Sequence, residues 1–84
     1  MPQLVYWSDE ARADVRAMDR ETALRLLKSL ARFVETESGS VKQMEGYDPP
    51  RYRLRVGDWR IIFQNCGGGA IEVIRVRHRG EAYR

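Results

Sequence analysis

Arginines alternate with apolar residues on both sides of a Gly57-Asp58 pair. If this pair forms a two-residue hairpin loop, one face of the hairpin is apolar or aromatic and Arg55 lies opposite Arg60 on the other. That second face carries four arginines, Arg51, Arg53, Arg55 and Arg60. Like charges that face each other destabilise a sheet. We therefore expect this face to bind an anion, and phosphate, which guanidinium groups bind through paired hydrogen bonds, is the best candidate.

Positive charge is concentrated in the second half of the chain. Residues 1–48 hold 7 Lys and Arg against 9 Asp and Glu, whereas residues 49–84 hold 8 arginines against 3 acids, giving a net charge of +3. Arginine suits planar recognition of phosphate better than lysine does, so this bias favours recognition over solubility alone. With 84 residues and 43% hydrophobic composition, the chain is expected to form a single domain, 1–84, around one small core.

Two helices are predicted in the first half. The apolar run 4–7 indicates an edge strand, and Ser8 and Asp9 are good caps for a helix from Asp9 to about Met18. A second helix is expected from about Asp19 to the polar run 36–40. Its apolar stripe recurs at three- and four-residue spacing and comprises Ala23, Leu24, Leu27, Leu30, Ala31 and Val34.

The second half is predicted to form a three-stranded antiparallel meander. Its third strand covers 71–78, after a loose turn at 66–69. A four-residue loop places Arg75 opposite Arg60, whereas a slip of one residue sends Arg75 to the helix-covered face, where an unpaired arginine is costly. We therefore predict Arg75 opposite Arg60 and Tyr52, Trp59 and Phe63 in the core. The predicted fold class is α+β, with two N-terminal helices packed on a small antiparallel sheet.

This order of elements resembles the RelE/ParE superfamily of toxins. The resemblance is carried by the motifs Val41-Lys42-Gln43-Met44-Glu45-Gly46, Tyr-Arg-Leu-Arg-Val-Gly-Asp-Trp-Arg-Ile-Ile-Phe and Ile-Arg-Val-Arg-His-Arg-Gly-Glu-Ala-Tyr-Arg, and covers almost the whole chain. It implies a toxin of a type II toxin–antitoxin module. In the RelE branch, such toxins enter the ribosomal A site and cut mRNA; in the ParE branch, they inhibit DNA gyrase.

The RelE branch also implies a set of site residues. Its basic pair on the first meander strand, its arginine after the turn and its C-terminal basic and tyrosine residues match Arg53, Arg55, Arg60, His78, Arg79 and Tyr83. ParE proteins generally lack this full set, which favours RNA cleavage. Type members carry lysine where Arg53 and Arg55 stand. Because a guanidinium stays protonated, neither arginine can act as a base.

The resemblance implies metal-free cleavage by the 2′-hydroxyl. The arginines would stabilise the negative charge of the transition state. Tyr83 is the preferred base, with His78 or Arg79 assisting at the leaving group, and His78 is the alternative for either role, as acid or as base. The further RNA-binding candidates are Arg51, Arg75, Arg77 and Lys42.

Two other functions stay open, a ParE-like gyrase inhibitor and a catalytically inactive module that binds RNA or an antitoxin. The expected partners are a cognate antitoxin that wraps and neutralises the toxin, the ribosomal A site and mRNA. DNA would be bound only through the antitoxin. No cofactor or metal is expected. The lone Cys66, the lack of a long apolar run and the lack of a signal sequence indicate a cytoplasmic protein with no membrane partner.

Overall fold

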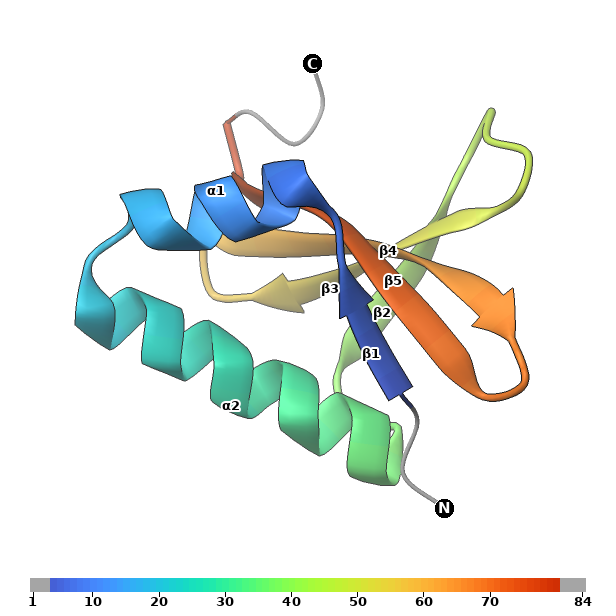
Figure 1. Ribbon diagram of the computed structural model, residues 1–84, viewed down its shortest axis with the longest axis horizontal. Coiled ribbons are helices and arrows are strands. Elements are labelled where there is room, and N and C mark those ends of the chain that lie inside the picture. The colour runs from blue at the N-terminus through green and yellow to red at the C-terminus, as the bar shows by residue number, and fades with distance from the viewer. Residues whose placement is uncertain (1–3, 81–84) are drawn as a thin grey trace.

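The computed structural model describes residues 4–80. Two helices lie on one side of a five-stranded sheet (Figure 1). In chain order the elements are β1 (Leu4–Trp7), α1 (Asp9–Ala17), α2 (Arg20–Thr36), β2 (Ser40–Met44), β3 (Arg51–Val56), β4 (Trp59–Gly67) and β5 (Ala70–His78). The predicted α+β class with two N-terminal helices is confirmed.

Both helices begin at side-chain caps. The Ser8 hydroxyl accepts a hydrogen bond from the Ala11 N–H at 3.0 Å, and an Asp19 carboxylate oxygen accepts one from the Thr22 N–H at 3.0 Å. Each bond satisfies a backbone donor that has no partner inside its own helix. The Ser8 hydroxyl also donates to the Ile74 carbonyl at 2.6 Å, which ties the start of α1 to β5.

The sheet has the strand order β1-β5-β4-β3-β2, with β1 parallel to β5 and the other neighbours antiparallel. The predicted edge strand at 4–7 is present. The meander, however, has four strands, because the unpredicted strand β2 pairs with β3. The sheet is mixed rather than purely antiparallel, because β1 runs parallel to β5. The two helices between β1 and the meander provide the connection that this parallel arrangement requires.

The Gly57-Asp58 hairpin has the predicted register, with Arg55 opposite Arg60 and Leu54 opposite Ile61. The predicted register of β5 is wrong. Arg77, not Arg75, lies opposite Arg60, and Arg75 lies opposite Ile62. The physical reason is that the loop is tighter than predicted, with only Gly68 and Gly69 between β4 and β5, and the pairing contains two irregularities. Both glycines have positive φ angles, 58° and 78°, which allow this short connection.

One core fills the space between the helices and the sheet. Its buried residues are Ala11, Leu26, Leu30, Leu54, Val56, Ile61, Phe63, Ile71, Val73 and Val76. As predicted, Tyr52, Trp59 and Phe63 belong to this side, and Tyr52 stacks on Phe63 with the ring centroids 5.7 Å apart.

The predicted stripe of α2 is partly wrong. Leu26 and Leu30 are buried, whereas Leu24 and Leu27 are 46% and 39% exposed. Two apolar stripes at helical spacing overlap on this helix, and periodicity does not distinguish which one meets the sheet.

A carboxylate fixes α1 to the outer side of β5. Asp14 accepts hydrogen bonds from Arg75 Nε at 2.8 Å, from Arg75 Nη2 at 3.0 Å and from the Val76 N–H at 2.9 Å. Burial favours the neutral acid, but the Arg75 and Val76 hydrogen bonds and the charges of Arg75 and Arg77 outweigh it. The pKa of Asp14 therefore lies below the ordinary value of 3.8. Beyond the end of β1, the Asp14 carboxylate thus accepts the β5 backbone N–H of Val76, which a longer β1 strand would otherwise bind.

Candidate anion-binding site on the open face of the sheet

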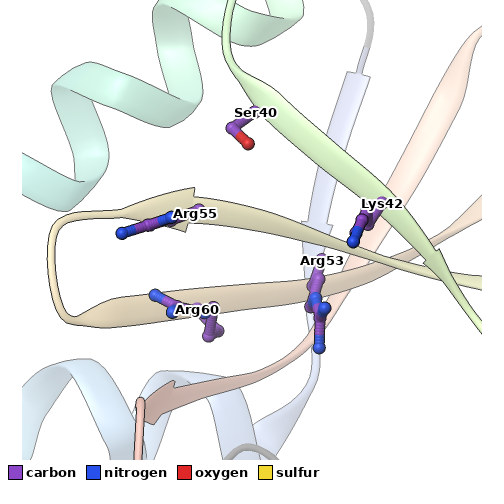
Figure 2. Close-up of a pocket in the computed structure, with 5 residues that line it drawn as sticks. All are labelled: Ser40, Lys42, Arg53, Arg55 and Arg60. Carbon is purple, nitrogen blue, oxygen red and sulfur yellow. The ribbon is translucent and has the colours of Figure 1, made fainter.

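A hollow of about 160 Å³ lies on the sheet face away from the helices, where β2, β3 and β4 adjoin. We call it the cationic pocket. Strand register brings its residues together, since Ser40 lies opposite Arg55, Lys42 opposite Arg53, and Arg55 opposite Arg60. Figure 2 shows the side chains of Ser40 and Lys42 extending from β2 towards the arginines. The lining residues are Ser40, Lys42, Arg53, Arg55 and Arg60.

Arg60 lines this pocket and is the only charged residue that is buried within the described part of the chain, with 8% of its surface exposed. Its Nη1 donates to the Gly57 carbonyl at 3.1 Å and to the Trp59 carbonyl at 2.9 Å. The hairpin turn thereby fixes the guanidinium. Carbonyl dipoles do not neutralise a full charge, and burying a charge is costly unless it is paired. An anion in the pocket would supply that pairing.

Positive charge extends beyond the pocket along one row of the sheet. Arg55, Arg60 and Arg77 lie opposite one another on three successive strands. Like charges that face each other destabilise a sheet. None of the five described residues that line the pocket is an acid. Of the predicted cleavage residues, the pocket gathers Arg53, Arg55 and Arg60. It also gathers Lys42, which was predicted as an RNA contact.

Two other predicted RNA contacts interact with groups of the protein itself. The Arg75 guanidinium pairs with Asp14. The Arg51 guanidinium lies over the Tyr47 ring, 4.6 Å from its centroid, in a cation–π contact. RNA binding by these two arginines, and by Arg77 in the row described above, stays a prediction.

Of the predicted proton-transfer residues, His78 and Arg79 do not line the pocket. His78 lies opposite Trp59 on the helix-covered side of the sheet, and its ring contacts the Trp59 ring edge-on at 5.3 Å between centroids. Arg79 donates its backbone N–H to the Asp58 carbonyl at 2.6 Å and holds its exposed guanidinium 3.8 Å from the Asp58 carboxylate. Tyr83 lies outside the described residues. The catalytic roles of all three stay predictions.

Ser40 is the pocket residue that sequence reasoning missed. It was overlooked because β2 is short and polar, with only Val41 and Met44 half-buried, so it carries no clear alternation. The available signal was the β-branched Val41 between two polar residues, two positions after Gly39.

Two further observations concern the described residues alone. No three His, Cys, Asp or Glu side chains within residues 4–80 gather closely enough to hold a metal ion. No helix in the same range is long and apolar enough to cross a membrane.

Comparison with solved structures identifies the fold. The archaeal RelE–RelB complex of Pyrococcus horikoshii OT3 contains a chain with a TM-score of 0.76 and 23% identity, covering 98% of this chain and 100% of that one. A chain of the Escherichia coli DinJ–YafQ toxin–antitoxin complex has a TM-score of 0.76 at 10% identity, with 100% of both chains covered. The RelBE2 complex of Mycobacterium tuberculosis gives 0.70 at 19%, covering 94% and 100%. Because the sequence identities are this low, the structural similarity establishes the fold alone.

Sequence comparison identifies the family. A search of curated protein sequences gave no match. Residues 5–83, nearly the whole chain, match the model of the family described as the ParE toxin of the type II toxin–antitoxin system parDE. The predicted superfamily is therefore confirmed. The chain belongs to the ParE toxin family, and it is a RelE/ParE-fold toxin of a type II toxin–antitoxin system.

Proposed function

We propose that this toxin is a ribosome-dependent mRNA endonuclease whose cationic pocket binds the scissile phosphate. The observation that carries the proposal is the buried Arg60, which is fixed by two carbonyls and shares the pocket with Arg55, Arg53 and Lys42. None of the described residues in the lining is an acid. In metal-free cleavage, the 2′-oxygen attacks phosphorus and the 5′-oxygen departs. Fixed cations stabilise the negative charge that accumulates on the phosphate in between.

The ribosome supplies what the pocket lacks. The described residues that line the pocket are all polar or charged, and none of them offers an aromatic ring on which a base could stack. Substrate positioning therefore comes from a partner that holds the mRNA. Positioning of this kind accounts for a large part of many rate accelerations. The ribosomal A site, within the cytoplasm, presents one codon at a time in an ordered conformation.

Mapping mRNA 5′ ends after induced expression tests this function. We expect codon-phased cuts on translating ribosomes that weaken by about 10²–10³-fold in Arg60→Ala, the effect typical of removing one transition-state donor. Arg32→Ala, which removes an exposed arginine from the outer side of α2, is the matched control and should cut normally. Intact mRNA in cells that express the wild-type protein at a toxic level would contradict the proposal.

A gyrase inhibitor is the second candidate, and two observations favour it. The matched family is that of ParE, and His78 lies on the opposite sheet face from the pocket. In that case the arginine face binds protein carboxylates and performs no chemistry. Accumulation of gyrase-linked DNA breaks, with intact mRNA, would identify this function in the same cells. Intact mRNA without DNA breaks or toxicity would leave an RNA- or antitoxin-binding module.

The cognate antitoxin is proposed to cover a second surface, between the two helices. A groove of about 340 Å³ there is lined by Trp7, Arg12, Val15, Arg16 and Leu27. Its floor is apolar, and the two arginines lie four residues apart on α1, so it fits an amphipathic segment with acidic flanks. The similar structures from M. tuberculosis and E. coli are toxin–antitoxin complexes.

A further inference from the structure

Lys42 differs chemically from the arginines around it. It is one of only two lysines in the chain, the other being Lys28. It lies on β2 opposite Arg53 and lines the cationic pocket, into which Figure 2 shows its side chain directed. Its ammonium group is exposed and takes part in no hydrogen bond or ion pair with residues 4–80. It is therefore available to a ligand in the pocket.

Arginines and lysine supply the same charge but not the same chemistry. A guanidinium stays protonated at every relevant pH and does not exchange its proton during a reaction. An ammonium group donates a proton and recovers it from water. Ser40, the remaining lining residue, has a hydroxyl that is far weaker as a proton donor than an ammonium group. Among the described residues of the lining, only Lys42 combines positive charge with a transferable proton.

We propose that Lys42 is the general acid of the cleavage reaction. The assignment deepens the proposed nuclease function and rests on it. As the bond from the 2′-oxygen to phosphorus forms and the bond from phosphorus to the 5′-oxygen breaks, Lys42 Nζ donates a proton to the departing 5′-oxygen. The 2′-hydroxyl proton passes to water, and water reprotonates the amine. The products are a 2′,3′-cyclic phosphate and a 5′-hydroxyl, with no change of oxidation state.

The division of roles follows from the register. Arg55, Arg60 and Arg77 form the row of fixed charge that stabilises the phosphate oxygens. Lys42 lies one strand further out, opposite Arg53, and is exposed to solvent. Because β2 is an edge strand, a proton donor on it is in contact with water and can be reprotonated between turnovers.

A leaving-group substitution tests the assignment. Ribosomes are programmed with a short synthetic mRNA whose scissile linkage, in a codon mapped as above, carries either the natural 5′-oxygen or a 5′-bridging sulfur. Sulfur departs as a thiolate and needs no proton. We expect Lys42→Arg, which keeps the charge, to cut the oxygen substrate about 10²–10⁴-fold more slowly than wild type, the usual effect of general acid–base catalysis. It should cut the sulfur substrate at the wild-type rate.

Lys28→Arg is the matched control, because it makes the same change at an exposed position on α2, and it should cut both substrates normally. Lys42→Gln, which also removes the charge, should be only partly rescued by sulfur. A normal rate of Lys42→Arg on oxygen, or equal slowing on both substrates, would overturn the assignment and leave the nuclease function standing. A wild-type toxin that cuts neither substrate would overturn both.

Discussion

Replacing Asp14 by alanine should destabilise the fold by about 2 kcal/mol, because one carboxylate holds α1 on β5. Asp14 accepts three hydrogen bonds, two of them from Arg75 and one from the Val76 N–H. Hydrogen bonds to charged groups contribute about 1.5–3 kcal/mol each when buried. The Asp14 and Arg75 side chains are 17% and 36% exposed, so water replaces part of what is lost. The total therefore falls near the value of one such bond rather than three.

Urea denaturation and thermal melting measure this loss. In a domain of this size, about 2 kcal/mol corresponds to a fall in melting temperature of about 8–16 °C. A double-mutant cycle with Arg75→Ala should give a coupling of about 1 kcal/mol, and the remainder belongs to the Val76 bond. Glu35→Ala, an exposed acid on α2, is the control and should change stability by less than about 0.5 kcal/mol. A loss that small for Asp14→Ala would refute the reasoning.

The same carboxylate predicts a pH dependence. The pKa of Asp14 lies below 3.8 in the folded protein, chiefly because the Arg75 and Val76 hydrogen bonds and the arginine charges outweigh burial. A lowered folded pKa means that the charge stabilises the fold fully above the unfolded value and that this stabilisation is lost as pH falls through the folded value. The stability gap between wild type and Asp14→Asn should thus be constant near neutrality and narrow below about pH 4. A difference in stability between wild type and Asp14→Asn that grows as the pH falls would contradict a lowered pKa of Asp14.

Two further predictions concern the hairpin turn and the helical groove. Gly57→Ala should lower the free energy of unfolding by about 1–2 kcal/mol in urea denaturation, because Gly57 has a φ of 59° and a methyl group would collide with the Arg25 guanidinium. Adding Arg25→Ala should restore only the part of the stability that the collision removes. Full recovery of stability in the double variant would contradict the contribution of backbone strain. Leu27→Glu should weaken antitoxin binding by at least about tenfold in a titration by calorimetry, since it puts an acid in an apolar groove that is proposed to receive acidic flanks. Unchanged affinity would place the antitoxin elsewhere.

The sequence predicted those features that a short, well-defined turn determines. A two-residue Gly-Asp loop leaves only one register for the hairpin, so the opposition of Arg55 and Arg60 followed directly. The glycine-rich loop after β4 has no such constraint. Its actual length and the pairing irregularity at Ile62 and Phe63 decide that Arg77 rather than Arg75 joins the row. Such irregularities arise from packing between strands and have no reliable sequence signal.

The pocket was predicted in part for the same reason. Its three arginines lie on the hairpin and were identified from alternation. Its other two residues lie on β2, which exists because β3 offers it an unpaired edge, and which has too few apolar residues to be recognised alone. Lys42 was named from the chain but could not be positioned opposite Arg53 without that strand.

The register of β5 also bears on which group can move a proton at the phosphate. Successive side chains of a strand point to opposite faces. Because Arg77 continues the row of Arg60, the next residue, His78, must share the face of Trp59, which its ring contacts. Arg77 and His78, which adjoin in sequence, therefore lie on opposite faces of β5. On the described strands, β2 places a charged proton donor, Lys42, on the arginine face.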